Sequence, residues 1–467
     1  MLSLTNSMER WALGVVLLMG TIVATTGSGV NAQSPQQALT GDWPSFLGPQ
    51  RDGRSTERGL DLAEVSQGLP LSWELACGTG YASCSVEGNR CLIFDGEPGF
   101  ARLRCVDAAN GKLLWTYRYP SAYEDMYGFD SGPRCAPVIS DGMVFVYGVE
   151  GELHAVDLQH GTRIWSVDVM DQFGCVQNFF GVGSTPLVYD DLLLVMVGGS
   201  PPDSQAVPPG QLDQVDANGS AVVAFDKRTG EVRYQIGDDL ASYGSIVTCT
   251  IDDQAWGFAF ARAGLLAFDP TRGDVRFHFP WRAKKLESVN ASTPVVVGNQ
   301  VFITESYRPG GCVLEVTDAA PPQVVWKDEG SRDQSMACHW CTPVFHEGYL
   351  YGCHGQHAGT AELRCVRWED GKVMWSHPGL GRCSVTFVDG QLICLGERGE
   401  LLLVEATPER FVQSATLAFK LPSGEVVPST DRLTYPAWAA PVVAGGQVYL
   451  RGKGQFIAAR LLSGQED

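Results

Sequence analysis

The chain has 467 residues, of which 34 are Lys or Arg and 53 are Asp or Glu, giving a formal net charge of −19. The basic residues form no stripe, which excludes a nucleic acid as partner, because phosphate backbones are bound through clustered Lys and Arg. With 44% hydrophobic and 10% aromatic residues, the composition is that of a packed globular protein and excludes a disordered or collagen-like chain. The 54 Gly, 26 Pro and 12 Trp predict many short strands and many turns.

The start of the chain has the pattern of a secretory signal peptide. Glu9 and Arg10 precede an apolar run over residues 11–24, and a small-residue cleavage pattern ends at Ala32. We therefore predict a signal peptide over residues 1–32 and a periplasmic or secreted mature protein. The alternative, an uncleaved membrane anchor, requires a longer apolar stretch. No other segment is predicted to span a membrane, so no stable membrane span is expected after cleavage.

Internal repeats follow from about residue 69 onwards. The first repeated element is a short apolar run ending in Asp, followed four residues later by Gly and, after four more, by an aromatic residue. Asp favours its own turn, Gly supplies a positive φ, and a large ring can fill the space between repeats. The copies begin at Leu103, Leu153, Val222, Leu265 and, with Arg in place of Asp, Leu363, and worn copies centre on Thr317, Glu405 and Arg460.

A second element, a small residue, any residue and often Pro, precedes each copy of the first. It is found at Cys135–Pro137, Ser184–Pro186, Ser292–Pro294, Cys341–Pro343 and Ala439–Pro441, with worn forms at Ala82, Ser245 and Cys383. Each unit holds four short strands, and eight such units predict an all-β, eight-bladed β-propeller of four-stranded antiparallel blades over residues 69–467. An unmatched Trp strand around Trp73 is expected to close the ring by pairing into the last blade. Seven blades are the alternative, and residues 33–68 are expected to be an extension that packs on the propeller.

The repeats resemble those of pyrroloquinoline quinone (PQQ) propellers, a family that includes quinoprotein dehydrogenases and BamB-type outer-membrane assembly proteins. A closer resemblance is to exported BamB-like propeller proteins of planctomycetes and related bacteria. It rests on Asp42–Pro49, Gly132–Arg134, Phe279–Arg282, Val289–Ala291 and Glu397–Leu401. The resemblance implies the fold, and it implies either a partner-binding scaffold or a PQQ enzyme.

A PQQ dehydrogenase requires a calcium ion held by carboxylate and amide oxygens, an Arg near the quinone oxygens and aromatic surfaces on both sides of the ring. The alcohol dehydrogenases of the family also carry two adjacent cysteines and in some cases a Cys-x-x-Cys-His haem site. This chain has no Cys-Cys pair, and Cys338–Cys341 is followed by Thr342. We therefore predict no cofactor, and PQQ with calcium is kept as the alternative.

Fourteen Cys in an exported chain permit disulfides. Cys91 and Cys105 flank a predicted hairpin turn at equal distances, and Cys353 and Cys365 have the same relation about Gly359. Two interpretations stay open for each pair: a disulfide across two strands, or buried free thiols. Seven Cys and His residues within positions 338–357 suggest zinc, but they fall on separate strands and turns, so structural Cys and surface His are preferred.

Long loops between units are expected on one face of the ring, where closed folds place binding groups. Polar residues just before an inner strand are predicted to surround the mouth of the central channel, and they are Arg134, Asn178, Arg282, Asn290, His339 and Arg382. Three arginines at one opening favour an anionic ligand or an acidic segment of a partner. The alternative is that each one bonds loop carbonyls and carboxylates. Aromatic residues in the same loops fit a recognition surface or the core of a lid.

The sequence thus predicts an exported, non-catalytic propeller that binds an exported or outer-membrane protein or an anionic small molecule. The competing hypothesis is a PQQ-dependent oxidoreductase of alcohols or sugars, for which Arg134, Arg282 and Asn290 are the cofactor-binding candidates. A carbohydrate-binding module, suggested by the aromatic loops, is a third.

Overall fold

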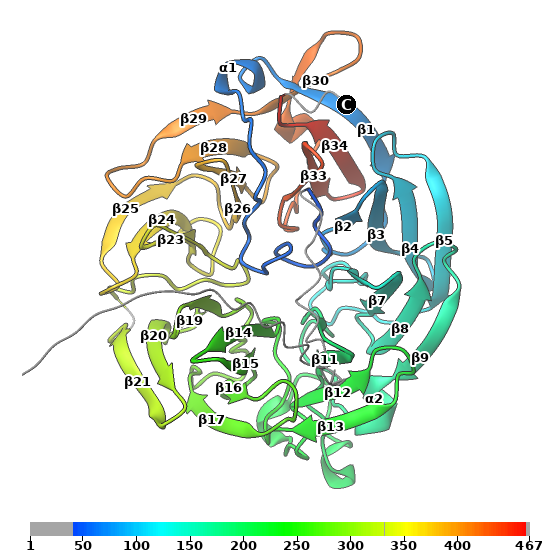
Figure 1. Cartoon of the computed structure of the whole chain (residues 1–467), viewed down its shortest axis with the longest axis vertical. Coiled ribbons are helices and arrows are strands. Elements are labelled where there is room, and N and C mark those ends of the chain that lie inside the picture. The colour runs from blue at the N-terminus through cyan, green and yellow to red at the C-terminus, as the bar shows by residue number, and fades with distance from the viewer. Residues whose placement is uncertain (1–40, 331, 464–467) are drawn as a thin grey trace, which may run out of the picture. The chain divides into compact units, whose positions relative to one another are not determined.

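A computed structural model describes residues 41–330 and 332–463, so the predicted signal peptide lies outside the described residues. The described chain is all-β, with eight antiparallel sheets arranged around a central axis (Figure 1). The expected eight-bladed propeller is confirmed, and the seven-bladed alternative is wrong. Its described helices are two short α-helices and three 3-10 turns: α1 (Leu62–Val65), α2 (Val169–Phe173), η1 (Pro202–Ser204), η2 (Leu212–Gln214) and η3 (Ser429–Asp431). None of the helices in these ranges has the length and apolar character needed to cross a membrane.

In blades 1 to 4 the strands follow in sequence order from the innermost to the outermost (Figure 1). Blade 1 contains β2 (Ser85–Glu87), β3 (Arg90–Glu97), β4 (Phe100–Asp107) and β5 (Leu113–Pro120). Blade 2 contains β6 (Val138–Ser140), β7 (Met143–Tyr147), β8 (Glu152–Asp157) and β9 (Arg163–Asp168). Blade 3 contains β10 (Leu187–Tyr189), β11 (Leu192–Met196), β12 (Val222–Asp226) and β13 (Val232–Ile236). Blade 4 contains β14 (Val247–Ile251), β15 (Gln254–Phe260), β16 (Gly264–Phe268) and β17 (Val275–Pro280).

Blades 5 to 7 have the same order. Blade 5 contains β18 (Val295–Val297), β19 (Gln300–Glu305), β20 (Gly310–Thr317) and β21 (Ala320–Lys327). Blade 6 contains β22 (Val344–His346), β23 (Tyr349–His354), β24 (Glu362–Arg367) and β25 (Val373–Pro378). Blade 7 contains β26 (Ser384–Val388), β27 (Gln391–Leu395), β28 (Leu401–Glu405) and β29 (Gln413–Thr416).

Blade 8 closes the ring with strands from both ends of the propeller. From the inside outwards it contains β32 (Val442–Ala444), β33 (Gln447–Gly452), β34 (Gln455–Arg460) and, as its fourth strand, β1 (Leu69–Ala76). β1 pairs antiparallel with β34, as the prediction of closure by an N-terminal strand required. Outside β1 lie β30 (Ala418–Lys420), which pairs with β1 in parallel, and β31 (Val426–Pro428).

Neighbouring blades are tied together through the Asp, Gly and aromatic positions of the repeat. Asp107 Oδ1 accepts two N–H bonds from its own turn, at 3.0 and 3.1 Å. The ring of Trp73 from blade 8 lies against Gly111, where a Cβ would come within 2.8 Å of it, and Trp73 Nε1 donates to Ala108 O at 2.8 Å. The same contact recurs for Trp115 on Gly161, Trp165 on Gly230, Tyr234 on Gly273 and Trp326 on Gly371. The rings therefore fill the space between blades, as the repeat predicted.

A segment before the propeller, residues 41–58, crosses the centre of the ring (Figure 1). Its contacts with the innermost part of the blades include Trp43 paired with Val86, Pro44 O with Ile139 N (2.8 Å), Arg51 Nη2 with Pro186 O (3.2 Å), and Arg54 Nη1 with Phe345 O (3.1 Å). In addition, Ser55 N donates to Phe387 O. Because these contacts reach five of the eight blades, the segment covers one end of the central channel. We name residues 41–58 the crossing segment.

Of the two interpretations of the Cys pairs, the disulfides are wrong and the free thiols are confirmed, since all fourteen Cys are free. The hairpin between β3 and β4 places Cys91 opposite Val106 rather than Cys105. Because side chains alternate between the faces of a strand, this shift of one residue sends the two thiols to opposite faces of the blade. Cys353 and Cys365 are two positions out of register across β23 and β24. Equal distance from a turn residue did not give the register, because the turn is not centred on that residue.

Candidate functional site

A cavity of about 210 Å³ lies on the axis of the ring, with residues from all eight blades in its wall. Phe46 and Leu47 of the crossing segment lie at one end of it. Its wall includes polar residues at the starts of inner strands, among them Thr185, Thr342 and Ser384. We name this cavity the axial pocket. The crossing segment makes it a blind pocket rather than a through-channel.

One sequence position of the repeat recurs in the wall of the axial pocket. This is the residue directly before the small residue of the second repeated element. Seven of the eight blades place that residue in the wall, and these residues are Tyr81, Arg134, Gly183, Ala291, Trp340, Arg382 and Trp438. Because the position is equivalent in every blade, the ring brings together side chains that are far apart in sequence.

Aromatic rings form a continuous layer on one side of the opening. The centroid of Trp438 lies 4.9 Å from Tyr81, 4.9 Å from Trp340 and 5.6 Å from Phe129. Phe180 continues the layer, 6.0 Å from Phe129. Rings at these distances form favourable tilted and edge-to-face pairs and offer a rigid apolar surface. We name Tyr81, Phe129, Phe180, Trp340 and Trp438 the aromatic mouth.

Arg382, a predicted site residue, lies within the aromatic mouth with its charge already paired. Its guanidinium carbon is 4.6 Å from the ring centre of Trp340 and 5.2 Å from that of Trp438. Arg382 Nη2 and Nε donate to Glu397 Oε2 at 2.7 and 3.1 Å, and the Glu397 side chain is only 2% exposed. Trp438 Nε1 donates to the same oxygen at 3.1 Å. The carboxylate therefore fixes both the arginine and the indole.

Arg134, a second predicted site residue, has a similar arrangement beside Tyr81 of the aromatic mouth. Arg134 Nη2 donates to Asp125 Oδ2 at 2.7 Å, and the side chain of Asp125 is fully buried. The guanidinium lies 5.6 Å from the ring centre of Tyr81 and 5.5 Å from that of Tyr123. It also donates to the carbonyls of Gly132 and Asp130. Both arginines of the axial pocket thus bond to the protein itself, as the structural alternative for them stated.

His339, the third predicted residue in the axial pocket, provides a neutral polar group. Burial, together with the positive charge of Arg382, lowers the pKa of His339 to about 3, so the ring is uncharged at neutral pH. His339 Nε2 lies 3.3 Å from Tyr307 Oη. His339 Nδ1 and Trp340 Nε1 are buried without a hydrogen-bond partner among the described residues. Two residues of the wall thus each carry a buried polar atom without a partner.

The other three predicted site residues lie outside the wall of the axial pocket. Asn290 is fully buried, and its Nδ2 donates to Ala261 O at 2.7 Å. Arg282 Nη2 donates to Asp213 Oδ1 at 2.6 Å. Asn178 Nδ2 donates to Ala241 O at 3.1 Å. These bonds hold the long loops in place, and bonding to loop carbonyls and carboxylates was the alternative stated for the polar site residues.

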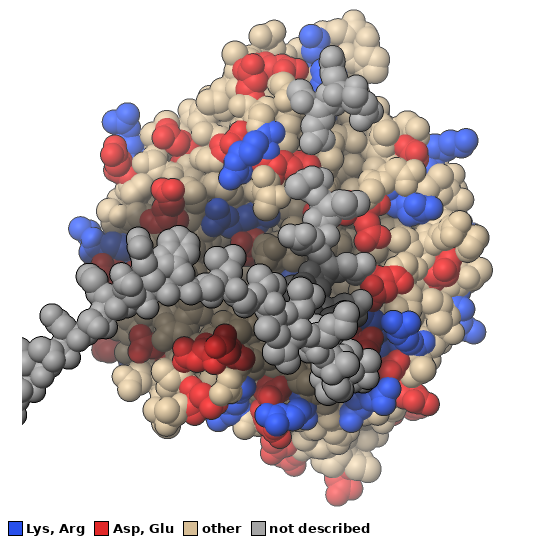
Figure 2. All heavy atoms as spheres, viewed as in Figure 1, with Lys and Arg blue, Asp and Glu red and all other residues tan. Residues whose placement is uncertain are grey.

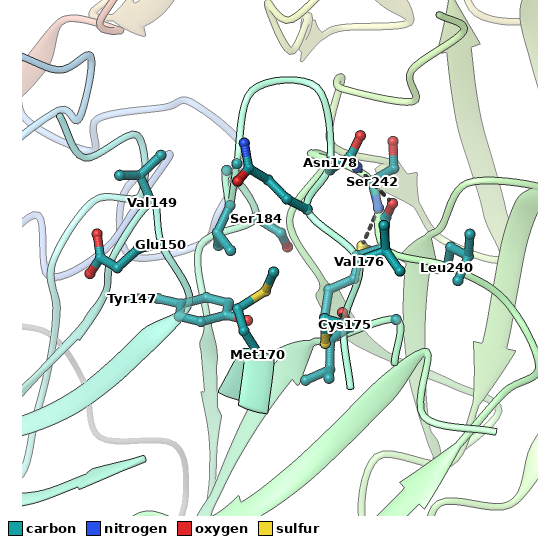
Figure 3. Close-up of a pocket in the computed structure, with 18 of the residues that line it drawn as sticks. Tyr147, Val149, Glu150, Met170, Cys175, Val176, Asn178, Ser184, Leu240 and Ser242 are labelled. Carbon is teal, nitrogen blue, oxygen red and sulfur yellow. Dashed lines mark hydrogen bonds between the residues drawn. The ribbon is translucent and has the colours of Figure 1, made fainter. Parts of the chain in front are cut away.

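A second cavity, of about 280 Å³, lies between blades 2 and 3 and is lined by Asn178 (Figure 3). Sulfur-bearing and polar side chains share its wall, among them Met170, Cys175 and Glu150. Glu150 Oε2 accepts a bond from Ser121 at 2.8 Å, and burial raises the pKa of Glu150. Burial also raises the pKa of Cys175 to about 12, so the thiol is protonated and a poor nucleophile.

The sequence reasoning missed Trp340, Trp438 and Tyr81, the rings that dominate the aromatic mouth. Only polar residues just before an inner strand were predicted to surround the channel mouth, whereas these rings occupy the equivalent repeat position in other blades. The signal that could have found them was present: both Trp residues directly precede the small residue of the second element, as do Arg134 and Arg382.

The residues at the axial pocket do not fit a calcium and PQQ site. Calcium requires several free oxygen ligands, including carboxylates. Glu397 is bonded to Arg382 and Trp438, and Asp125 is bonded to Arg134. Within residues 41–330 and 332–463, no three His, Cys, Asp or Glu side chains converge as metal ligands. The donor set thus lacks the oxygens that would hold the cofactor's calcium ion.

Comparison with known families gives a match over most of the propeller. A family model described as "Outer membrane protein assembly factor BamB" matches residues 71–201 and 99–377. Relatives with a described activity are dehydrogenase subunits of quinone alcohol dehydrogenases. That of Komagataeibacter europaeus is 28% identical over 255 residues, 49% of this chain and 31% of the relative. That of Gluconobacter oxydans is 26% identical over 218 residues, 45% of this chain and 26% of the relative. The match therefore spans about a third of the length of these relatives or less.

Solved structures of both kinds share the fold. BamB from Moraxella catarrhalis has a TM-score of 0.55 and 10% identity, and the alignment covers 85% of this chain and 99% of that one. Quinohemoprotein alcohol dehydrogenase from Comamonas testosteroni has a TM-score of 0.62 and 12% identity, with 92% and 82% covered. Similarity at this level of identity concerns the fold, and a fold of this kind carries different functions.

Proposed function

The chain belongs to the family described as outer membrane protein assembly factor BamB, and on this basis we propose that it is a non-catalytic binding propeller, periplasmic or secreted, that holds an exported or outer-membrane protein at the aromatic mouth.

The observation that carries the proposal is the chemistry of the axial pocket. Its two arginines are paired with buried carboxylates, and aromatic side chains form part of its wall. Aromatic clusters with a few fixed polar groups are typical of protein-binding hot spots. We expect an apolar or aromatic side chain of the partner to fill the pocket.

The charge distribution is consistent with recognition through apolar contacts. On the face drawn in Figure 2, Lys and Arg are interspersed with Asp and Glu outside the grey area, and neither sign forms a separate patch. The net charge of −19 keeps the protein soluble and disfavours strongly acidic partners. This limits the anionic-ligand hypothesis to a local contact with Arg134 or Arg382.

Substitution at the mouth tests the proposal. Phe129 is 41% exposed, so Phe129→Ala removes a ring of the mouth at little cost in stability. We expect at least a tenfold weaker association with a protein that copurifies with the wild-type chain from envelope extracts. Leu113→Ala is the control, since Leu113 is 54% exposed on β5, the outermost strand of blade 1, and is expected to leave association unchanged. Equal association of both variants with every copurifying protein contradicts the proposal.

The alternative function is a PQQ-dependent oxidoreductase, which the quinone dehydrogenase relatives favour. Arg134 and stacked aromatic rings at the pocket are the groups that such a site shares with this one. Titration of the calcium-loaded protein with PQQ, followed by calorimetry and visible absorption, separates the two. We expect no saturable binding. One-to-one binding with a shifted quinone spectrum would instead support the oxidoreductase and justify a screen of alcohols and sugars.

A further inference from the structure

Hydroxyl groups form an arc of hydrogen bonds from blade to blade around the axis of the ring. Ala136 N donates to Thr185 Oγ1 at 3.2 Å, which joins blade 2 to blade 3. Thr185 N in turn donates to Ser245 Oγ at 3.0 Å. Further along, Ser245 N donates to Thr293 Oγ1 and Thr293 N to Thr342 Oγ1, each at 3.0 Å. Each oxygen therefore lies between the segments that lead into the innermost strands of neighbouring blades.

Two of these threonines, Thr185 and Thr342, belong to the wall of the axial pocket. Thr342 follows Trp340 of the aromatic mouth by two positions in the chain. The crossing segment contacts the chain just beyond the threonines, at Pro186 O and Phe345 O. Along the chain, the two threonines thus come between the aromatic mouth and the crossing segment, which closes the far end of the pocket.

The hydroxyls of these two threonines are hydrogen-bond donors. A threonine hydroxyl carries one donor proton and two acceptor lone pairs. In Thr185 and Thr342 the oxygen accepts a backbone N–H, and neither hydroxyl donates to an acceptor within residues 41–330 and 332–463. Thr342 is the more accessible of the two, 8% exposed against 2%. Its proton is therefore free for an oxygen acceptor from outside the chain.

Charge and size restrict what the pocket can take. Arg134 and Arg382 are already paired with the buried carboxylates of Asp125 and Glu397, and His339 is neutral. An anion would enter without a free counter-charge, at a high cost in desolvation. The volume of about 210 Å³ is below the range of about 300–1,000 Å³ typical of sites for drug-sized ligands, so it suits a single group of the size of a side chain.

We propose that the axial pocket takes an uncharged phenol group, with its ring among those of the aromatic mouth and its oxygen accepting the hydroxyl proton of Thr342. A phenol has an aromatic body, which pairs favourably with Trp and Tyr rings, one oxygen at its tip and no charge at neutral pH. Among protein side chains this group is tyrosine, which is enriched in binding hot spots. A tyrosine of the partner as its source rests on the proposed function, whereas the phenol chemistry does not.

Titration of the purified full-length protein with three fluorinated probes, followed by fluorine NMR, tests the chemistry without a partner. The probes para-fluorophenol, fluorobenzene and para-fluorobenzoate share one ring and differ in the presence and charge of an oxygen-bearing group. We expect saturable binding of para-fluorophenol, about fivefold tighter than that of fluorobenzene, which is the effect of one net hydrogen bond. We expect para-fluorobenzoate to bind more weakly than para-fluorophenol. Equal affinity for the phenol and fluorobenzene, tighter binding of the benzoate, or no binding of the phenol overturns the proposal.

Matched variants locate the phenol oxygen. Thr342→Val removes a hydroxyl of the wall, and Thr293→Val removes one of the same arc outside the wall. Each leaves one backbone N–H of the preceding blade without its acceptor, so both variants should lose similar stability. We expect Thr342→Val to weaken binding of para-fluorophenol about fivefold and to leave fluorobenzene unchanged, and Thr293→Val to change neither. Equal weakening by both variants, or weakening by Thr185→Val alone, contradicts the assignment of Thr342. The comparison of probes uses the wild-type chain and does not depend on the folding of a variant.

Addition of para-fluorophenol to the copurified complex separates this proposal from the proposed function. Release of the partner as the probe concentration rises supports a tyrosine of the partner in the pocket. Retention of the partner by a chain that binds the probe contradicts both the tyrosine source and partner binding at the aromatic mouth, while the phenol site then belongs to a free ligand.

Discussion

At the scale of single residues, the opening of the axial pocket depends on buried carboxylates that are not themselves in contact with a bound group. Glu397 holds Arg382 and Trp438 in one geometry, and Asp125 does the same for Arg134. Each pair combines a charge-assisted hydrogen bond with a ring that covers the guanidinium. The aromatic side chains of the mouth are therefore positioned by ion pairs, and loss of either charge of a pair is expected to move them.

Removal of one charge from such a pair is expected to destabilise the fold. Arg382→Met leaves the Glu397 carboxylate buried without its partner, and we expect a loss of about 3 kcal/mol in the free energy of unfolding, measured by urea titration. Arg398→Met, on an exposed neighbour, is the control and is expected to change it by less than about 0.5 kcal/mol. The double variant with Glu397→Gln should recover part of the loss. Equal stability of the two single variants contradicts the structural role given to Arg382.

Glu305, at the end of β19, makes a prediction about pH. Its side chain is fully buried and accepts a bond from Ser288 Oγ at 2.8 Å, and burial raises its pKa to about 7. In the unfolded chain the pKa of a Glu is about 4.3. Between about pH 4.3 and about pH 7 the folded chain therefore keeps a proton on Glu305 that the unfolded chain has lost. The free energy of unfolding falls over this pH range, because ionisation of Glu305 is easier in the unfolded chain.

Glu305→Gln removes that loss because the amide does not ionise. Relative to the wild-type chain, we expect the variant to gain up to about 3 kcal/mol in the free energy of unfolding between pH 4.5 and 8, measured by urea titration at each pH. Buried His residues such as His354, whose pKa is lowered to about 4, act in the opposite direction but equally in both proteins. A constant difference across this range refutes the assignment.

At the scale of the repeat unit, the interface between blades explains why three residue types recur. The Asp fixes the turn, and the Gly at positive φ leaves room for a ring from the preceding blade. The ring then donates its N–H to a carbonyl of that turn, as Trp115 does to Leu158 O at 2.9 Å and Trp165 to Lys227 O at 3.0 Å. The repeat is thus the pattern of an interface that neither blade could form alone.

A glycine pair in blade 1 separates the two requirements. Gly111 and Gly99 both have positive φ, 72° and 80°, but only Gly111 faces a ring, that of Trp73. Gly99→Ala is expected to cost about 1–2 kcal/mol for the backbone conformation alone. Gly111→Ala is expected to cost about 2–4 kcal/mol, since overpacking against Trp73 adds to it. Thermal and urea unfolding of the two variants measure this difference in stability. Equal losses of stability would mean that the contact between Trp73 and Gly111 does not stabilise the closed propeller.

The same periodicity determined how far the sequence could be interpreted. A residue type that recurs at one spacing, such as the Asp and Gly of the turns, reports a shared backbone environment, and so the blades and their closure could be predicted. Asn290 is not part of the repeated pattern. Nothing in the residues around it distinguishes an amide that bonds its own loop from one that binds a ligand. The Cys91 register failed because a one-residue shift in a turn changes the face of every residue beyond it.

At the scale of the whole molecule, two long-range connections close the propeller and leave its central channel open at one end only. β1 completes blade 8 and removes the free edge of the sheet, and the crossing segment covers one end of the channel. As a result, Phe46 and Leu47 from before the first blade and Trp438 from the last share one pocket. The account's central claim is that this opening, rather than the outer strands, contacts the partner.

Site-specific photocrosslinking in the native cell envelope tests that claim most directly. A benzophenone amino acid is placed at Phe129 or Tyr435, which are 41% and 50% exposed beside Trp438, and at Leu113, which is 54% exposed on the outer strand of blade 1. We expect one defined exported or outer-membrane protein to be crosslinked from Phe129 and Tyr435 and not from Leu113. Crosslinking of the same protein from all three positions, or from Leu113 alone, would contradict the assignment of the aromatic mouth as the binding site.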